Sequence, residues 1–196
     1  MSTIEAVRQR IEDALKGHAA DYIEIRLEES EVSYIRYRNR ELEDIGRAAT
    51  LGGNVRAQVA GGWGFISFND INELSEKVEI AVKWARSVGK ESSALAQAKP
   101  VVDIVETEIK EDPVQVPLID KKQLLDEYND IIWCVPRIQS SSISYSDAHK
   151  KVIFANSEGS YIEQERVDVT LRLVAIARSD GDVQQVGISL GSKGDF

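Results

Sequence analysis

Apolar residues recur at intervals of three and four positions in three segments of the chain, and this spacing predicts three amphipathic helices. The first covers about residues 2–16. The second follows Asp70, which is placed to cap it, and ends before Gly89. The third starts with Asp120 as its cap and stops before Pro136, because the residue preceding a proline disfavours helical geometry.

Alternation of apolar and polar residues predicts the strands, because successive side chains of a strand point to opposite faces. Gly61 and Gly62 separate two such runs and suit a tight hairpin, whose central positions need positive φ. Turn-forming residues at 147–149, 156–159 and 179–182 separate the last strands. The expected strands are 21–27, 33–38, 54–60, 63–68, 101–107, 138–146, 150–155, 160–178 and 183–190.

The order of these elements predicts an α+β fold in which helices pack on one face of antiparallel sheets. Residues 90–100 are polar and rich in alanine, have no amphipathic period, and are interpreted as a linker. We therefore expect two αβ lobes, 1–89 and 101–196, that use a similar plan without a residue-level repeat. A chain of 196 residues can bury a core without disulfides or a structural metal.

Charge and hydropathy limit the classes of partner and the cellular compartment that the sequence supports. The chain has 24 basic and 33 acidic residues and a net charge of −9, which disfavours nucleic acid and anionic membranes as partners. Arg36, Arg38 and Arg40 alternate along one predicted strand, but acidic residues follow at once, so a solvated strand face is favoured over a phosphate-binding stripe. No stretch approaches the ~20 apolar residues of a membrane span, and the first residues do not resemble a signal peptide. A cytoplasmic protein is expected.

Candidate catalytic residues are few. The two histidines, His18 and His149, lie outside any metal-binding spacing, and a catalytic zinc site usually needs three protein ligands. His18 is interpreted as a residue at a helix end, and His149 as part of a polar hairpin turn. The single cysteine, Cys134, excludes an internal disulfide and is interpreted as a buried, inert thiol.

The glycines around Trp63 do not lie between a strand and a helix, so they do not form a phosphate-binding loop. Trp63 and Phe65 are expected in the core, since large aromatic side chains are more often buried than used for ligand stacking. The paired carboxylates are interpreted as solvated faces or turns. Composition and spacing alone lead no further than a cytoplasmic α+β domain.

Four motifs in order along the chain resemble the TldD/PmbA family, also called modulators of DNA gyrase. They are Ala20-Asp-Tyr-Ile-Glu-Ile-Arg26, Gly53-Asn-Val-Arg56, Gly62-Trp-Gly-Phe65 and Asn156-Ser-Glu-Gly159, followed at 160–191 by the family's strand–Asp-Gly–strand rhythm. The resemblance covers nearly the whole chain.

This resemblance implies a cytoplasmic protein that forms homo- or heterodimers and belongs to a group of metallopeptidases acting on unfolded or flexible peptides. The family holds its metal in a His-Glu-x-x-x-His motif of a C-terminal domain, and this sequence lacks that motif. No catalytic residue, metal ligand or cofactor is therefore expected in this chain, and zinc is expected only in a full-length protein. The chain is either the N-terminal region of a longer peptidase or a stand-alone relative. Its acidic composition gives no support to a connection with gyrase.

Antiparallel sheets with free edges can accept an extended peptide as an added strand. We expect such a platform at 138–190, with Arg56, Trp63, Asn156 and Glu158 as candidate peptide-binding residues. The alternatives are that Arg56 simply pairs with a carboxylate and that Asn156 serves a turn. Three functions compete: a substrate-binding and dimerisation region of a metallopeptidase, a structural protein–protein interaction module without a peptidase role, and an enzyme using carboxylates between the lobes.

Overall fold

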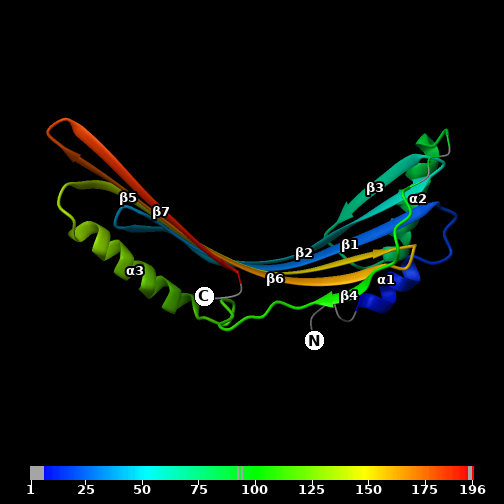
Figure 1. Cartoon of the computed structure of the whole chain (residues 1–196), viewed down its shortest axis with the longest axis horizontal. Helices are drawn as coiled ribbons and strands as arrows, with labels where there is room; N and C mark the ends of the chain where they lie inside the picture. The colour runs from blue at the N-terminus through cyan, green and yellow to red at the C-terminus, as the bar shows by residue number, and fades with distance from the viewer. Residues whose placement is uncertain (1–6, 92, 94, 194–195) are drawn as a thin grey trace. The chain divides into compact units, whose positions relative to one another are not determined.

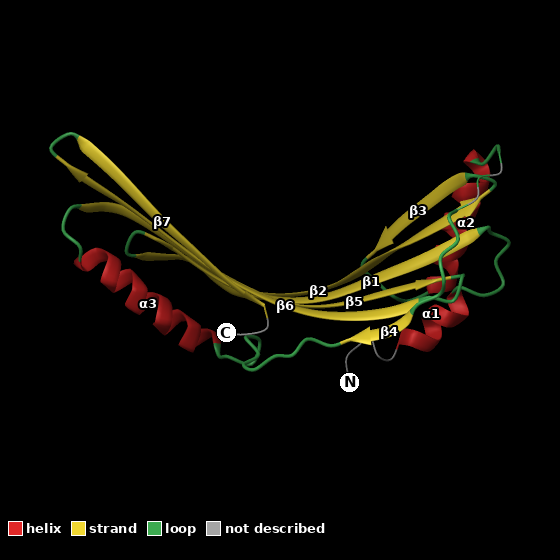
Figure 2. Ribbon diagram, viewed as in Figure 1, coloured by secondary structure: helices red, strands yellow, loops and turns green. Residues whose placement is uncertain are grey.

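The computed structural model describes residues 7–91, 93, 95–193 and 196, and these form a seven-stranded sheet with three helices (Figures 1 and 2). The strand order is β3-β2-β1-β5-β6-β4, and β7 also pairs with β6. β2 pairs with β3, and β6 with β7, in antiparallel orientation, whereas β4 pairs with β6 in parallel. The elements are α1 (Arg8–Ala14), β1 (Tyr22–Arg38), β2 (Glu41–Val59), β3 (Gly62–Phe68), α2 (Leu74–Val88), β4 (Val102–Val105), α3 (Leu118–Cys134), β5 (Ile138–Asn156), β6 (Tyr161–Ser179) and β7 (Asp182–Lys193).

The strands are longer and fewer than the sequence pattern predicts. The runs expected at 21–27 and 33–38 are one strand, β1, and those at 138–146 and 150–155 are one strand, β5. The turn expected at 147–149 is wrong, and His149 therefore lies in a strand. The physical reason is that Asp147 is buried inside β5, where Oδ2 of its carboxylate pairs with Lys121 instead of serving a turn.

The helices agree with the sequence pattern in number and place. Of the first predicted helix, residues 1–6 lie outside the described part, and α1 ends at Ala14. α2 begins at Leu74, because Asp70 uses its carboxylate to accept the backbone N–H of Asn72 at 2.8 Å and so forms a turn before the helix. α3 follows Pro117 directly, two residues before the expected cap Asp120.

The chain folds into two compact units that interleave along the sequence. Unit 1 comprises 1–30, 50–106 and 151–165, and unit 2 comprises 31–49, 107–150 and 166–196. The predicted division into 1–89 and 101–196 differs from these units, because β1, β2, β5 and β6 each contribute residues to both.

In unit 1, α1 and α2 pack on one face of the sheet around buried apolar side chains. This core includes Ile11, Ile25, Val55 and Val78. The β2–β3 hairpin turns at Ala60 and Gly61, whose φ values of 47° and 76° are positive as the predicted tight turn requires.

Two glycines of β3 allow α2 to approach the sheet closely. A Cβ at Gly64 would lie 1.9 Å from the carbonyl oxygen of Ala81, and one at Gly62 would lie 2.4 Å from that of Ala85. The helix side of β3 therefore has no room for side chains at these positions.

In unit 2, α3 packs on one face of the sheet. Its core contains Ile35, Tyr37, Leu125, Ile143 and Tyr145. The strand predicted at 160–178 contributes to it, since side chains of β6 at 169, 171 and 173 pack against this cluster. Both units thus confirm the α+β class with helices on one face. No helix in the described ranges is long and apolar enough to cross a membrane.

Candidate functional site

The face of the unit 1 sheet that carries no helix presents a network centred on a buried carboxylate. Because Ile23 and Ile25 face the helices, Tyr22, Glu24 and Arg26 point to the opposite side. Only 5% of the Glu24 side chain is exposed. A carboxylate so deeply buried requires partners that replace its hydration.

Three side chains supply those partners. The Tyr22 hydroxyl donates a hydrogen bond of 2.9 Å to Oε2 of Glu24. Oε1 lies 2.9 Å from Nε of Arg56 and 3.6 Å from Nε of Arg26. The alternative reading of Arg56, that it pairs with a carboxylate, is therefore correct as a description of its contacts.

Aromatic rings surround this network. The Arg56 guanidinium lies 5.1 Å from the ring centre of Trp63, and the Arg26 guanidinium lies 5.0 Å from that of Phe154. The Trp63 ring also meets the Tyr22 ring edge-on, with centres 6.1 Å apart. We call the surface formed by the following side chains the arginine–aromatic surface: Arg26, Arg56, Trp63, Phe65 and Phe154.

Trp63 and Phe65 are 41% and 52% exposed, so the prediction that they lie in the core is wrong. The reason is the register of β3. Gly62 and Gly64 occupy its helix side, and alternation sends the two aromatic rings to the helix-free side.

Asn156 joins the network, and Glu158 lies near it. The Asn156 amide donates to the Tyr22 hydroxyl at 3.5 Å and its Oδ1 accepts the backbone N–H of Ser160 at 2.8 Å, which is the turn role considered for it. Burial raises the pKa of Tyr22, and the carboxylates of Glu24 and Glu158 add to that rise against the lowering effect of Asn156. The structure thus brings Arg56, Trp63 and Asn156 together, with the exposed Glu158 within electrostatic reach.

Sequence reasoning missed Glu24, Tyr22, Arg26 and Phe154 as members of this site. A signal existed for the first three, because alternation in the strand at 21–27 places residues 22, 24 and 26 on one face. No pattern in the sequence links Phe154 to these residues. Phe154 contacts Arg26 only because β5 lies beside β1 in the sheet.

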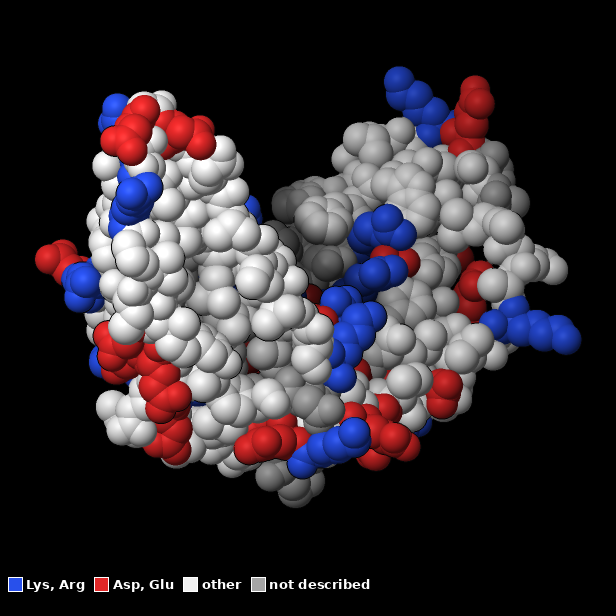
Figure 3. Space-filling view, turned by 60° about the vertical axis from the view of Figure 1, so that its left-hand side comes forward, with Lys and Arg blue, Asp and Glu red and all other residues white. Residues whose placement is uncertain are grey.

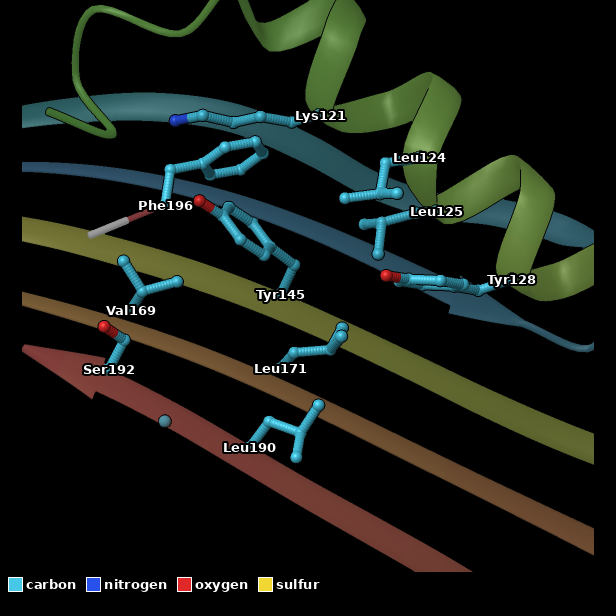
Figure 4. A pocket seen from close by; sticks show the side chains of 11 residues that line it. Lys121, Leu124, Leu125, Tyr128, Tyr145, Val169, Leu171, Leu190, Ser192 and Phe196 are labelled. Carbon is cyan, nitrogen blue, oxygen red and sulfur yellow. The ribbon is translucent and has the colours of Figure 1, made fainter. Parts of the chain in front are cut away.

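Unit 2 contains a groove of about 360 Å³ between α3 and the sheet (Figure 4). Apolar side chains from α3, β6 and β7 form most of its wall, and the ring of Phe196 meets that of Tyr145 at one end, with centres 6.0 Å apart. Burial raises the pKa of Tyr145, and the neighbouring Asp147 carboxylate raises it further. The lining residues are Lys121, Leu124, Leu125, Tyr128, Tyr145, Val169, Leu171, Leu190, Gly191, Ser192 and Phe196.

A buried polar cluster lies at the start of α3. The Lys121 ammonium lies 2.5 Å from Oδ2 of Asp147 and donates a hydrogen bond of 2.7 Å to Oγ of Ser33. The Ser33 hydroxyl also donates to Oδ2 of Asp147. The Asp147 carboxylate binds both the amine of Lys121 and the hydroxyl of Ser33, so both groups are engaged within the cluster. We interpret it as an attachment of α3 to the sheet.

The described residues contain no group of three or more His, Cys, Asp and Glu side chains suited to hold a metal ion. His18 follows α1, and His149 lies in β5. Cys134 is exposed, so the expectation of a buried thiol is wrong. The buried stripe of α3 runs through Lys121, Leu125 and Asn129, and Cys134 does not lie on it. The donor set within the described ranges does not fit a metal, and we assign it no metal-dependent step.

Lys and Arg side chains are flanked by Asp and Glu side chains on the face seen in Figure 3. Arg36 and Arg38 of β1 are both exposed, and they pair with Asp44 at 3.3 Å and Glu43 at 3.0 Å. These pairs agree with the solvated strand face that the sequence favours over a phosphate-binding stripe.

The class of protein is an α+β fold made of two units that interleave along the sequence. In unit 1 the helices cover one face of the sheet, and the arginine–aromatic surface lies on the other. The PmbA/TldA metallopeptidase domain 1 matches residues 23–87, and the PmbA/TldA metallopeptidase central domain matches residues 111–196. The chain belongs to the PmbA/TldD family of metallopeptidases. The unmatched stretch, 88–110, contains the segment interpreted as a linker.

Relatives by sequence are named metalloproteases. One from Synechocystis sp. is 39% identical over 170 residues, which cover 86% of this chain and 36% of that protein. One from Methanocaldococcus jannaschii is 29% identical over 184 residues, covering 90% of this chain and 40% of that protein. The chain therefore spans less than half the length of these relatives.

Solved structures share the fold. A protein from Thermotoga maritima named as a modulator of DNA gyrase superposes with a TM-score of 0.78 at 17% identity, covering 97% of this chain and 43% of that one. TldE from Thermococcus kodakarensis gives 0.69 at 14% identity, covering 98% and 43%. At these identities the likeness concerns the fold alone.

Proposed function

We propose that this chain is the substrate-binding and pairing region of a metallopeptidase that acts on unfolded or flexible peptides, and that it does not catalyse hydrolysis by itself. The observation that carries this proposal is the arginine–aromatic surface. Two large aromatic side chains of β3 are about half exposed on it. Exposed aromatic rings beside arginine are typical of surfaces that bind other chains.

The position of β3 supports an extended ligand. β3 is an edge strand of the sheet, and its main-chain groups on the outer side can pair with an added strand without regard to sequence. Alternate side chains of that strand would lie beside Trp63 and Phe65. On the opposite side, α2 covers Gly62 and Gly64.

The exposed apolar residues of β7 support an additional role, pairing with a second protein. This strand pairs with β6 along one side, and its residues Val186, Ile188 and Leu190 are 63%, 53% and 57% exposed. Leu171 and Leu173, the β6 partners of Leu190 and Ile188, belong to the face that α3 packs against. A row of exposed apolar residues on an edge strand is a typical protein-binding feature. We propose that it contributes to a homo- or heterodimer with a family member.

The family and the composition support further proposals about the metal, the compartment and the partners. The names of the relatives support a metal-dependent peptidase, and we propose that zinc binds in another part of the full-length protein. A single cysteine, which excludes an internal disulfide, supports a cytoplasmic location. The net charge of −9 supports a role without nucleic acid or membrane partners.

The proposal is tested by fluorescence anisotropy with a labelled unfolded peptide. We expect saturable binding, and we expect Trp63→Ala to weaken it about tenfold, or about 1.4 kcal/mol, because an aromatic anchor is lost. Trp84→Ala is the matched control, since Trp84 lies in the same unit on α2 and is 48% exposed. Equal effects of the two changes, or no binding at all, would contradict the proposal.

Hydrolysis is followed in the same samples with and without added zinc, and none is expected. Cleavage that survives a chelator would favour an enzyme using carboxylates. A stable dimer that ignores peptides would favour the structural interaction module, for which the exposed apolar row of β7 is the supporting observation.

A further inference from the structure

We infer that the arginine–aromatic surface binds a carboxylate carried by the bound peptide, through the guanidinium groups of Arg26 and Arg56. This inference rests on the proposed function and defines the class of peptide. The two guanidiniums flank one carboxylate, Glu24, at 3.6 Å and 2.9 Å from its Oε1. Among these direct ion pairs, two positive charges face one negative charge, so one guanidinium charge is not matched by contact; the exposed Glu158, within electrostatic reach of Tyr22, reduces this excess without pairing with either arginine.

Hydrogen-bond donors are available on both arginines. Within the part of the chain that the structure describes, each guanidinium meets Glu24 through Nε, and neither makes a further hydrogen bond or ion pair. The Arg26 and Arg56 side chains are 56% and 46% exposed. A guanidinium carries five N–H groups in a fixed fork that matches a carboxylate, so the terminal N–H groups of both side chains can serve a ligand.

The arginines are also positioned in advance. Glu24 is fixed by the Tyr22 hydroxyl and holds both Nε atoms, while Trp63 and Phe154 lie against the two guanidiniums. Side chains held in their binding orientation lose less entropy when a ligand arrives. The aromatic rings limit rotation without using an N–H group.

Arg36 provides an internal comparison because it lies on the same strand, β1, in unit 2. It pairs with Asp44 at 3.3 Å and lies 5.9 Å from the ring centre of Tyr34. Asp44 is 42% exposed and Arg36 is its partner in a one-to-one pair, so no excess of positive charge arises there. Arg36 is 57% exposed, close to the value for Arg26.

The net charge of the whole chain opposes the binding of acidic peptides. A net charge of −9 repels acidic peptides and attracts basic ones at long range. A preference for an acidic peptide can therefore arise only from a local site.

The experiment compares three blocked peptides of alternating sequence, valine–glutamate, valine–glutamine and valine–lysine, binding to the 196-residue chain. We expect the glutamate peptide to bind about tenfold more tightly than the glutamine peptide, a difference typical of charge-assisted hydrogen bonds. The lysine peptide should bind most weakly. Arg56→Gln should reduce the glutamate-to-glutamine ratio to about one, and Arg36→Gln should leave it unchanged.

Arg26→Gln is the second variant, because removing Arg56 takes away the nearer partner of a buried carboxylate and can impair folding. It should reduce the same ratio while Arg56 still pairs with Glu24. A ratio of one in the unaltered chain, or binding strongest for lysine, would overturn the inference and leave the proposed function intact. Binding of none of the three peptides would remove both. Inorganic phosphate that binds as well as the glutamate peptide would show a site for free oxyanions and also overturn the inference.

Discussion

The ammonium group of Lys121 lies 2.5 Å from the carboxylate of Asp147, and neither side chain is exposed to solvent. The pair connects the first turn of α3 to the middle of β5. Of the α3 residues that are buried, Lys121, Leu125 and Asn129, two are polar. The attachment of this helix therefore depends on a buried ion pair as well as on apolar packing.

Removing one member of this pair should destabilise the chain strongly. Lys121→Met leaves Asp147 buried without its cation, which costs about 3–5 kcal/mol of unfolding free energy. The double variant Lys121→Met, Asp147→Leu should recover most of that loss, because no uncompensated charge remains. Urea denaturation of the three proteins measures this. A double variant less stable than the single one would contradict the account.

The contribution of Asp126 on α3 to the stability of the fold should depend weakly on pH. Burial favours a raised pKa for Asp126, but hydrogen bonds from Lys122 and Tyr37 outweigh it and hold the pKa below its ordinary value of about 3.9. Ionised Asp126 therefore stabilises the fold above about pH 4, and this contribution is lost as the pH falls through the lowered pKa.

Asp126→Asn measures this contribution by thermal unfolding between pH 7 and pH 2. The unaltered chain should be more stable above about pH 4 by less than about 0.5 kcal/mol, because the partly exposed pair is screened by solvent. The difference should disappear near pH 2. A difference that grows as the pH falls would show that the sign is wrong.

Gly64 should tolerate no side chain. Gly64→Ala places a methyl group 1.9 Å from the carbonyl oxygen of Ala81, so β3 and α2 must separate at a cost of about 3 kcal/mol. Gly187→Ala in β7 is the matched control, since its nearest neighbour would lie at 3.6 Å. That change should be neutral or stabilising by about 0.5 kcal/mol. Denaturation curves of equal midpoint for the two variants would refute the packing argument.

The apolar row of β7 should affect self-association. Ile188→Lys places a charge in that row and should lower the dimer fraction measured by sedimentation equilibrium about tenfold, as edge-strand charges oppose pairing. Ile131→Lys on α3 is the control, because Ile131 is 64% exposed and lies outside the row. An unchanged dimer in Ile188→Lys would assign the pairing to another surface.

Periodicity predicted the helices and the fold class because these depend on local apolar spacing. It missed the first part of β2, where Gly46, Ala48 and Ala49 interrupt any alternation of large apolar residues. It also placed a turn at Asp147, since the lysine that pairs with this carboxylate is 26 positions away in the sequence. Contacts of that range leave no local pattern.

The candidate site was accessible from the sequence only in part. Arg56 and Trp63 stood in recognisable motifs, but whether Trp63 is buried depends on which face of β3 the glycines occupy. Hydrophobicity alone favours burial and gives the wrong answer. The pairing of Glu24 with Arg56 depends on the register of β1 and β2, which the sequence pattern leaves open.

Hydrogen exchange of the chain with and without a saturating valine–glutamate peptide tests the central claim, peptide binding at the edge strand beside the arginine–aromatic surface, most directly. The account predicts slower exchange of the β3 amides, at 62–68, because an added strand accepts and donates main-chain hydrogen bonds there. Unchanged exchange in β3 at saturation, or protection confined to β7, would contradict it.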